Sequence, residues 1–266
     1  MFLGDRAISA GYRLEEFDAL GSTNDEAASR IARGDPGRLW VIAQNQTKGR
    51  GRFGRQWVSP PGNLYASLLL IDPAPPPLSA QLGFVAGVAL IGALRQVIGG
   101  DAPVKLKWPN DVLCGGAKLS GLLLEGASLS NGLFGCVVGF GVNCLSSPTD
   151  APYPTASLKS IGAASCDRAA LFAALSNHLV EALELWARGE NFAGVRAAWL
   201  ENAGGIGGPA RVVRGGASLD GRFLGIDAQW RMLLERQDGA TEIIEAGDVT
   251  LGPAQRPLEN RQKEQQ

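Results

Sequence analysis

A short basic segment between two strand-length apolar runs, residues 39–44 and 64–71, limits the folds open to this chain more than any other feature. Residues 48–55 pack four cations and three glycines into eight positions. Glycine lets the backbone approach a ligand closely, and arginine presents a planar fork of N–H donors that matches carboxylate and phosphate oxygens. No acidic residue lies between Gln44 and Ile71, so we expect nothing nearby to neutralise the cations. The segment predicts a polyanion-binding loop held between two strands, and a solvated basic loop is the alternative.

The composition is that of an ordinary globular protein and argues against several functions. The 266 residues carry a net charge of -1, with 45% hydrophobic and 19% charged residues, which permits a substantial core in one or two domains. This charge argues against a protein that coats nucleic acid non-specifically. The first residues lack a targeting signal, and no run of about 18 apolar residues without charge is evident. We therefore expect a cytoplasmic protein with no membrane partner.

The cysteines and the single histidine give no sign of a metal site. Cys114, Cys136, Cys144 and Cys166 show no C-x-x-C spacing, and His178 lies far from them in sequence. The sequence therefore predicts neither a zinc site nor a disulfide framework.

Periodicity and turn residues predict helices and strands over most of the chain. The predicted helices span residues 24–33, 79–98, 167–186 and 192–202, and the predicted strands span 39–44, 64–71, 104–108, 118–125 and 133–143. A capping box from Thr23 to Glu26 begins the first helix and Gly34 ends it, while Ser165 or Asp167 caps the third. The last three of these strands are separated by good turn signals and indicate a meander.

A change of character follows the glycine-rich residues 204–208. Short β-rich pieces then alternate with Gly-Gly and Asp-Gly turns, with predicted strands over residues 210–214, 222–227, 232–236 and 241–246. We expect a first domain over residues 1–204, a small all-β domain over 205–254 and a polar, disordered tail over 255–266.

Four polar clusters follow the ends of the predicted strands: residues 22–24, 46–57, 107–111, and Lys118 with Gly121. The motifs that contain them, GRGRFGRQWVSPPGNLYAS, KWPNDV, KLSGLLLE and GFGVN, follow one another over about 120 residues. With these motifs in this order, the chain resembles the catalytic core of the biotin protein ligases.

The resemblance implies an α+β fold, in which a mixed or antiparallel central sheet with flanking helices, of the class II synthetase-like type, precedes a small SH3-like β-barrel. It implies that biotin and ATP, with Mg²⁺, form biotinyl-5′-AMP and pyrophosphate. One lysine of a biotin carboxyl carrier domain, from acetyl-CoA carboxylase or a related carboxylase, then attacks the adenylate. A homodimer is a further expectation from the family. One departure is Trp230, where the family usually has a glycine, and this puts the turn around it in doubt.

The resemblance also implies roles for individual residues. By motif position, biotin contacts fall to Ser22, Thr23, Asn24, Gln46, Gly49, Arg50, Gly51, Arg52, Lys118, Gly121 and Gly139. Nucleotide contacts fall to Arg50, Arg52, Arg55, Trp57, Lys118 and Asn143, with Asn143 also at the magnesium end. The expected catalytic residues are Arg52 and Lys118, beside the biotin carboxylate and the α-phosphate, and Asp111, which would orient or deprotonate the incoming lysine. The cations would offset the charge that accumulates during adenylation.

Each of these residues has a purely structural alternative. Ser22 and Thr23 can cap a helix, Trp57 can be a core anchor, Gly139 can mark tight packing, and Asp111 can form a turn.

Two other functions compete with biotin ligation. A lipoate protein ligase shares the adenylation chemistry but needs no partners for a ureido group, and the GRGR and KWPND motifs favour biotin. A nucleic-acid binding module would place the arginines of residues 50–55 on phosphates and stack Phe53 and Trp57 on bases. Only 21 residues precede Ser22, too few for the winged helix-turn-helix domain of repressor ligases, so we expect no DNA partner.

Overall fold

The structure is a computed structural model that describes residues 1–100, 102–129, 132–163 and 167–252. The chain divides into two compact units, which join between Asn202 and Ala203. Cys166, the alternative cap Ser165 and the predicted tail over residues 255–266 lie outside the described residues.

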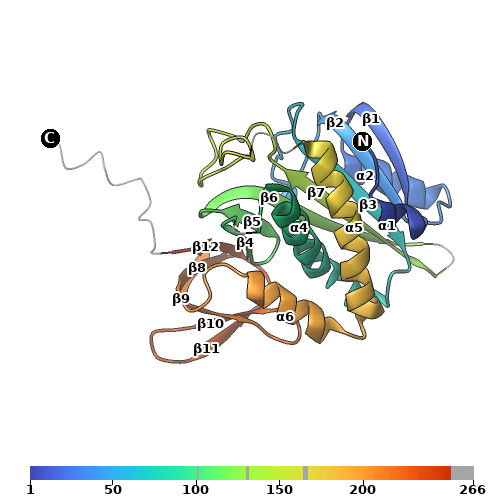
Figure 1. The fold of residues 1–266 in the computed structure, drawn as a ribbon. Helices are drawn as coiled ribbons and strands as arrows, with labels where there is room; N and C mark the ends of the chain where they lie inside the picture. The colour runs from blue at the N-terminus through green and yellow to red at the C-terminus, as the bar shows by residue number, and fades with distance from the viewer. Residues whose placement is uncertain (101, 130–131, 164–166, 253–266) are drawn as a thin grey trace. The chain divides into compact units, whose positions relative to one another are not determined.

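A seven-stranded mixed sheet forms the centre of the first unit (Figure 1). In spatial order its strands are β1 (Arg13–Leu20), β2 (Leu39–Gln46), β3 (Leu64–Ile71), β7 (Phe134–Val142), β6 (Ala117–Ser128), β5 (Asp111–Cys114) and β4 (Val104–Lys107). Strands β1 and β2 are parallel, and every other neighbouring pair is antiparallel. The prediction of a mixed or antiparallel central sheet is therefore confirmed.

Helices cover both faces of this sheet. On one face, α2 (Thr23–Ala32) buries Ala27 and Ile31 against Leu39, Leu69 and Val137. On the other face, Trp40 and Phe140 pack together, and Phe172 of α5 (Arg168–Trp186) meets the Trp40 ring edge-on at 5.2 Å. The remaining helices are α1 (Asp5–Ser9), α3 (Pro76–Ser79), α4 (Leu82–Ile98) and α6 (Phe192–Asn202). Because both faces are covered, β2 and β3 read as nearly continuous apolar runs.

The strongest local signals in the sequence mark the ends of elements correctly. Gly34, with φ of 76°, follows the end of α2, and Asp167 caps α5 by accepting from the N–H of Ala169. The predicted capping box is wrong by one residue, because Ser22 is the N-cap and its hydroxyl accepts from the N–H of Asp25. The Thr23 side chain is thereby left to contact the sheet.

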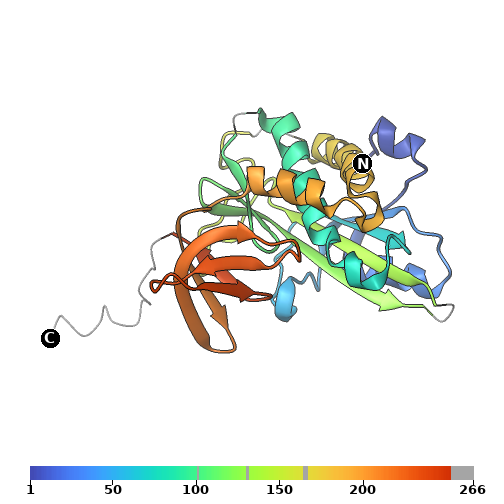
Figure 2. The same cartoon turned by 90° about the horizontal axis from the view of Figure 1, so that it is seen from below.

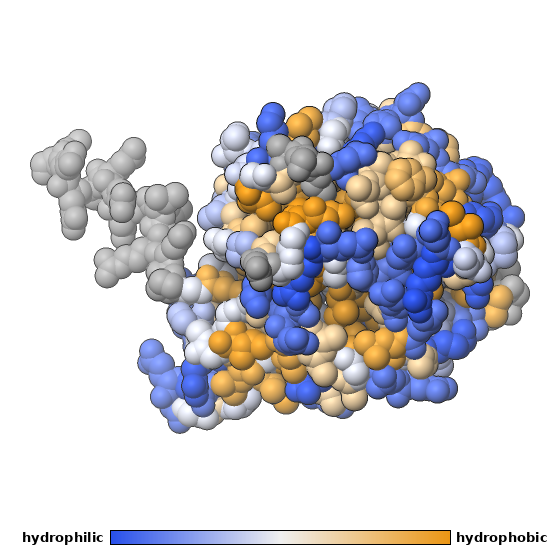
Figure 3. Space-filling model, viewed as in Figure 1, coloured by the Kyte–Doolittle hydropathy of each residue, from blue (hydrophilic) through white to orange (hydrophobic). Residues whose placement is uncertain are grey.

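Within the described part of the chain, one helical stretch is long and apolar enough to cross a membrane. It covers Pro76–Ile98, which includes α3 and α4, and most of it is buried within the protein. Ser79 and Gln81 interrupt its apolar residues. On the face that Figure 3 shows, apolar residues form several separate patches among polar ones.

The second unit is a five-stranded antiparallel sheet, shown in orange and red in Figure 2. Its strands are β8 (Pro209–Arg214), β9 (Ala217–Ile226), β10 (Met232–Glu235), β11 (Thr241–Ile244) and β12 (Asp248–Leu251), in the spatial order β11-β10-β9-β8-β12. The turn before β10 forms with Trp230 at φ 56°, and the Asp227 carboxylate accepts from the N–H groups of Gln229 and Arg231. A tryptophan is thus accommodated where the family usually has glycine.

Candidate active site

The predicted polar clusters meet on the face of the sheet that α2 covers. In β6 and β7, Gly121 pairs with Gly141 and Leu123 with Gly139. Residues directly opposite in an antiparallel pair point to the same face, so this strip is narrow and nearly bare of side chains. A Cβ on Gly139 would lie 2.3 Å from Oδ1 of Asn24, so the glycine admits the first turn of α2.

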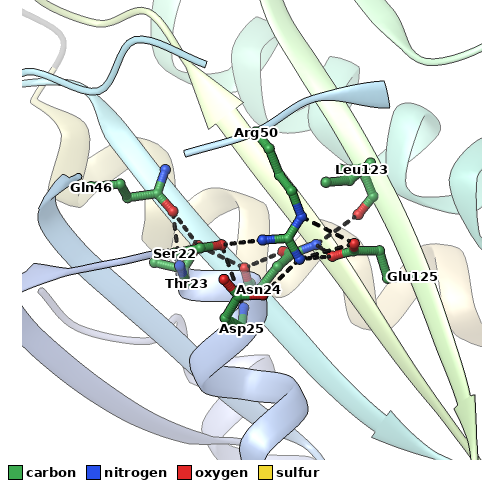
Figure 4. Close-up of polar contacts among 9 residues, drawn as sticks. Ser22, Thr23, Asn24, Asp25, Gln46, Arg50, Leu123 and Glu125 are labelled. Atoms are coloured by element: carbon green, nitrogen blue, oxygen red, sulfur yellow. Dashed lines mark hydrogen bonds and ion pairs between the residues drawn. The ribbon is translucent and has the colours of Figure 1, made fainter. Parts of the chain in front are cut away.

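The start of α2 joins the end of β2 through a group of short hydrogen bonds (Figure 4). The backbone N–H and the hydroxyl of Thr23 contact Oε1 of Gln46 at 2.8 and 3.1 Å. The buried Ser67 hydroxyl lies 2.8 Å from the Thr23 hydroxyl and 2.6 Å from Oδ1 of Asn24. The amide nitrogen of Asn24 donates to Glu125 at 2.7 Å. Thr23, Asn24 and Ser67 are buried, while Gln46 and Glu125 are half-buried.

Acidic residues that are distant in sequence neutralise part of the basic segment. The Arg50 guanidinium contacts both carboxylate oxygens of Glu125 at 2.9 Å and Oδ1 of Asp25 at 2.7 Å. The hydrogen bond to Asp25, followed by that to Glu125, raises the pKa of Arg50. The expectation that nothing neutralises these cations is therefore wrong for Arg50, because the fold brings α2 and β6 to it.

The basic loop itself, residues 48–57, has a closed base and an exposed tip. Arg50 and Gln56 form an antiparallel bridge, and the N–H of Trp57 donates to the carbonyl of Gly49 at 2.9 Å. The N–H of Gly51 donates to the carbonyl of Arg55 at 2.7 Å. A Cβ on Gly49 would lie 2.6 Å from Oγ of Ser59, so only glycine fits there.

At the tip, a single turn of 3₁₀ helix spans Arg52–Gly54, and Phe53 is 68% exposed with φ of 57°. The Arg52 and Arg55 guanidinium carbons lie 4.8 and 5.5 Å from the Phe53 ring centroid. Arg52 also donates to Oδ1 of Asn110 at 3.3 Å. The tip therefore presents two arginines and an aromatic ring together.

The Trp57 ring lies across the glycine strip. A Cβ on Gly141 would lie 2.5 Å from the ring, and one on Gly121 would lie 3.1 Å from it. The Lys118 ammonium lies 5.5 Å from the centre of the Trp57 ring and 5.4 Å from that of Tyr153. The buried indole N–H of Trp57 has no hydrogen-bond partner among the residues that the structure describes, which leaves a donor at this floor.

Two lysines share one carboxylate beside this floor. Nζ of Lys118 lies 2.7 Å from one oxygen of Asp111, and Nζ of Lys107 lies 3.2 Å from the other. Asp111 begins β5 and pairs with Gly121 of β6. This pairing brings the Asp111 carboxylate close to Lys118 of β6. Both carboxylate oxygens are thus engaged, and an incoming amine would share them with the two lysines.

Asn143 is buried and braces the backbone behind Lys118. Its side-chain nitrogen donates to the carbonyl of Ala156 at 3.0 Å and lies 3.5 Å from that of Lys118. Among the described residues, no group of three or more His, Cys, Asp or Glu side chains could hold a metal ion. The donors therefore fit only an ion that brings most of its own ligands, as Mg²⁺ does when it is bound by nucleotide phosphates.

Several residues at this site were not assigned from the sequence. They are Asp25, Ser59, Ser67, Asn110, Glu125 and Tyr153. Glu125 ends the KLSGLLLE motif and Asn110 lies in KWPNDV, so both residues could have been assigned to the site from the motifs. The partners of the others depend on strand register, which the sequence does not reveal.

A separate cleft of about 550 Å³ lies beside the other ends of β1 and β2. It is lined by residues such as Tyr12, Arg38, Ile71 and Arg188. It contains none of the predicted site residues, so we place the candidate site at the glycine strip.

Comparisons with known proteins agree with this geometry. Residues 20–143 match the model of the biotin/lipoate A/B protein ligase family. A biotin--[acetyl-CoA-carboxylase] ligase from Paracoccus denitrificans is 37% identical over 87% of this chain and 97% of its own length. One of the same name from Mycobacterium tuberculosis is 33% identical over 93% of both chains. A solved structure, the biotin protein ligase from Aquifex aeolicus in complex with biotin and ATP, superposes with a TM-score of 0.75 at 26% identity, covering 90% of this chain and 97% of that one. This chain therefore belongs to the biotin protein ligases, within the biotin/lipoate A/B protein ligase family.

Proposed function

We propose that this protein is an ATP-dependent biotin protein ligase. The observation that carries the proposal is the joining of three features on one sheet face: a basic loop with a fixed base, a glycine floor under Trp57, and the Lys118 and Asp111 pair. In the first step an oxygen of the biotin carboxylate attacks the α-phosphate of ATP, and the bond to pyrophosphate breaks. In the second step a lysine amine of a biotin carboxyl carrier domain attacks the acyl carbon, and AMP leaves.

The polar groups at the start of α2 suit the ureido end of biotin. Thr23, Asn24 and Gln46 supply hydroxyl and amide groups, whose hydrogen-bond partners can be exchanged by rotation. The biotin tail would then run over the glycine strip toward Lys118, where its carboxylate meets positive charge. Buried polar groups at one end and an apolar wall along the rest are typical of such pockets.

The cations near the loop tip suit the phosphate groups of ATP. Arg52 and Lys118 would lie at the biotin carboxylate and the α-phosphate, and Arg55 with Trp57 on the nucleotide side. Positive charges that are already oriented before the reaction stabilise the charge that develops in the transition state. Mg²⁺, when it is bound, neutralises phosphate charge, and the Asn143 amide is the side chain we assign to that end.

Asp111 holds Lys107 and Lys118 together, so we assign it first to positioning Lys118 and second to receiving the carrier lysine. The carrier domain, of acetyl-CoA carboxylase or a related carboxylase, is the macromolecular partner that we propose. A cytoplasmic location, a homodimer and the lack of a DNA partner remain predictions of the same proposal. A titration with duplex DNA at physiological salt tests the last of these.

Lipoate or octanoate ligation is the alternative that the family leaves open. Pyrophosphate release in the presence of ATP and Mg²⁺ distinguishes the acids. We expect release with biotin and none above background with lipoate or octanoate, because the latter two have no ureido group for Thr23, Asn24 and Gln46. Equal turnover with lipoate would overturn the biotin assignment.

A further inference from the structure

An arginine at the base of the basic loop, residues 48–57, is held by two carboxylates. Arg50 is the residue that is fastened, and its guanidinium is shared between Asp25 at the start of α2 and Glu125 on β6 (Figure 4). Its Nε and terminal nitrogens contact the Glu125 carboxylate at 3.2, 2.9 and 2.9 Å. A fork-to-carboxylate pair of this kind fixes direction as well as distance.

Glu125 also holds the start of α2. Its second oxygen accepts from Asn24 at 2.7 Å, and Asn24 in turn accepts from Ser67 at 2.6 Å. The contacts continue from Ser67 through Thr23 to Gln46, and from Gln46 to Ser59, whose hydroxyl donates to the carbonyl of Trp57. The chain of contacts therefore begins at Arg50 on one side of the loop and returns to Trp57 on the other.

The exposed tip holds Arg52 and Arg55 beside the Phe53 ring, and Arg52 donates to the amide oxygen of Asn110. Arg50 is 29% exposed in its side chain, and the two carboxylates that hold it come from elements far apart in the sequence. The base of the loop thus holds a cation that two carboxylates neutralise.

We propose that Glu125, with Asp25, is a positioning residue that holds Arg50 as a strut of the biotin pocket, and that Arg50 does not serve as a ligand of the ATP phosphates. This assignment replaces the phosphate role predicted for Arg50 from motif position. The expected effect on kinetics rests on the proposed function, whereas the contacts of Arg50 with Asp25 and Glu125 do not depend on any substrate.

The rate of trypsin cleavage after Arg50 reports how firmly the Arg50 side chain is held, because trypsin must bind the arginine side chain in its own acidic pocket before it cleaves. Brief digestion of the protein without substrates, with the first cuts identified by mass spectrometry, gives the rate of cleavage after Arg50 relative to the rate after Arg52. In Glu125→Gln, the rate after Arg50 relative to Arg52 should rise by roughly fivefold or more, since a charge-assisted pair is replaced by a neutral contact. Asp25→Asn should shift the ratio in the same direction while leaving the Asn24 contact with Glu125 in place.

Glu15→Gln is the matched control. Glu15 is paired with Arg30 of α2 at 2.5 Å, and its side chain is 37% exposed, against 38% for Glu125. It should leave the cleavage ratio unchanged. A cleavage ratio that stays the same in both Glu125→Gln and Asp25→Asn would overturn the proposal.

Steady-state kinetics distinguish a specific effect of Glu125 on the biotin pocket from a general loss of order in the site. Glu125→Gln should raise the KM for biotin by roughly tenfold and leave the KM for ATP and kcat within about twofold, because the strut serves the biotin pocket and not the phosphates. An equal rise in the KM for ATP would restore the phosphate role of Arg50 and contradict the proposal. If the wild-type protein does not turn over biotin, the proposed function fails, while the cleavage ratios still decide whether the strut exists.

Discussion

The Lys118 side chain contacts three other residues of the site. It reaches Asp111, Trp57 and Tyr153 with its ammonium group, while its carbonyl accepts from the N–H of Ala156. A cation that is held on several sides needs little rearrangement when a negative charge develops beside it. For this reason we expect its effect to appear in the chemical step more than in substrate binding.

Replacing Lys118 with alanine tests this role. We expect Lys118→Ala to slow adenylate formation by about 2 to 4 kcal/mol in the transition state, the scale for losing one preorganised electrostatic partner. Single-turnover release of pyrophosphate measures it. Lys105→Ala removes an exposed lysine from β4 and is the control. A rate in Lys118→Ala equal to that of the control would exclude the role.

Arg52 leads to a prediction about the fate of the intermediate. If Arg52 retains biotinyl-5′-AMP, Arg52→Gly should let it escape more than about tenfold faster, because a charged contact worth on the order of 2 kcal/mol is lost. The escaped adenylate reacts with any amine, so an unrelated protein mixed with the variant, biotin and ATP should become biotinylated. A bystander signal no higher than wild type, from a variant that still makes adenylate, would show that Arg52 does not retain the intermediate.

At the scale of elements, the glycine strip of β6 and β7 sets the position of the Trp57 ring. We predict that Gly141→Ala displaces the ring, because the new methyl group would lie 2.5 Å from it. Overpacking of this kind costs about 1 to 3 kcal/mol, and we expect weaker substrate binding together with a change in tryptophan fluorescence. Gly83→Ala is the control, since a Cβ there meets nothing within 4 Å. Unchanged fluorescence and affinity in Gly141→Ala would contradict the packing described here.

The turn from Asp227 to Arg231 leads to a pH-dependent prediction for the second unit. Burial alone would raise the pKa of Asp227, but hydrogen bonds from Arg231 and Gln229 outweigh it and lower that pKa below its usual range. A carboxyl whose pKa is depressed in the folded state stabilises the fold above its unfolded pKa of about 3.9, and this contribution is lost as the pH falls through the folded-state pKa. Asp227→Asn should therefore lower the free energy of unfolding by about 1 kcal/mol at neutral pH.

Denaturant unfolding of wild type and Asp227→Asn at about pH 7, 5 and 3 measures this contribution. The difference between the two proteins should persist at the middle pH and shrink at the lowest. A difference that stays constant across the series would mean that the carboxylate charge is not its source.

The sequence predicted those elements that have strong local signals. The bounds of β3 and α6 match the prediction, because a continuous apolar run and a helical repeat are bounded by clear turn residues. Strand β1 was missed because it is an edge strand with Glu15, Glu16 and Asp18 among its residues, so no apolar periodicity shows. The short elements α1, β5 and β12 have too few residues to produce a period.

The site was predictable to the extent that it lies within motifs. Thr23 with Gln46 and Lys118 with Asp111 are brought together as the four clusters suggested. The acidic partners of Arg50 were not predicted, because Asp25 and Glu125 reach it only once the sheet register is set.

At the scale of the whole molecule, the first unit contains every residue assigned to the chemistry. The second unit has its own buried core, which includes Phe223, Met232, Leu234 and Ile244. The account therefore predicts that adenylation and transfer both depend on the site on the α2 face of the seven-stranded sheet.

Transfer of biotin to a carrier domain is the decisive measurement for the proposed ligase activity. The purified protein is incubated with ATP, Mg²⁺, biotin and an isolated biotin carboxyl carrier domain, and the carrier is examined by intact-mass and peptide mass spectrometry. The account predicts the addition of one biotinyl group to a single lysine, dependent on ATP and absent with Lys118→Ala. A carrier that stays unmodified by wild-type protein, or that is modified equally well with lipoate in place of biotin, would contradict it.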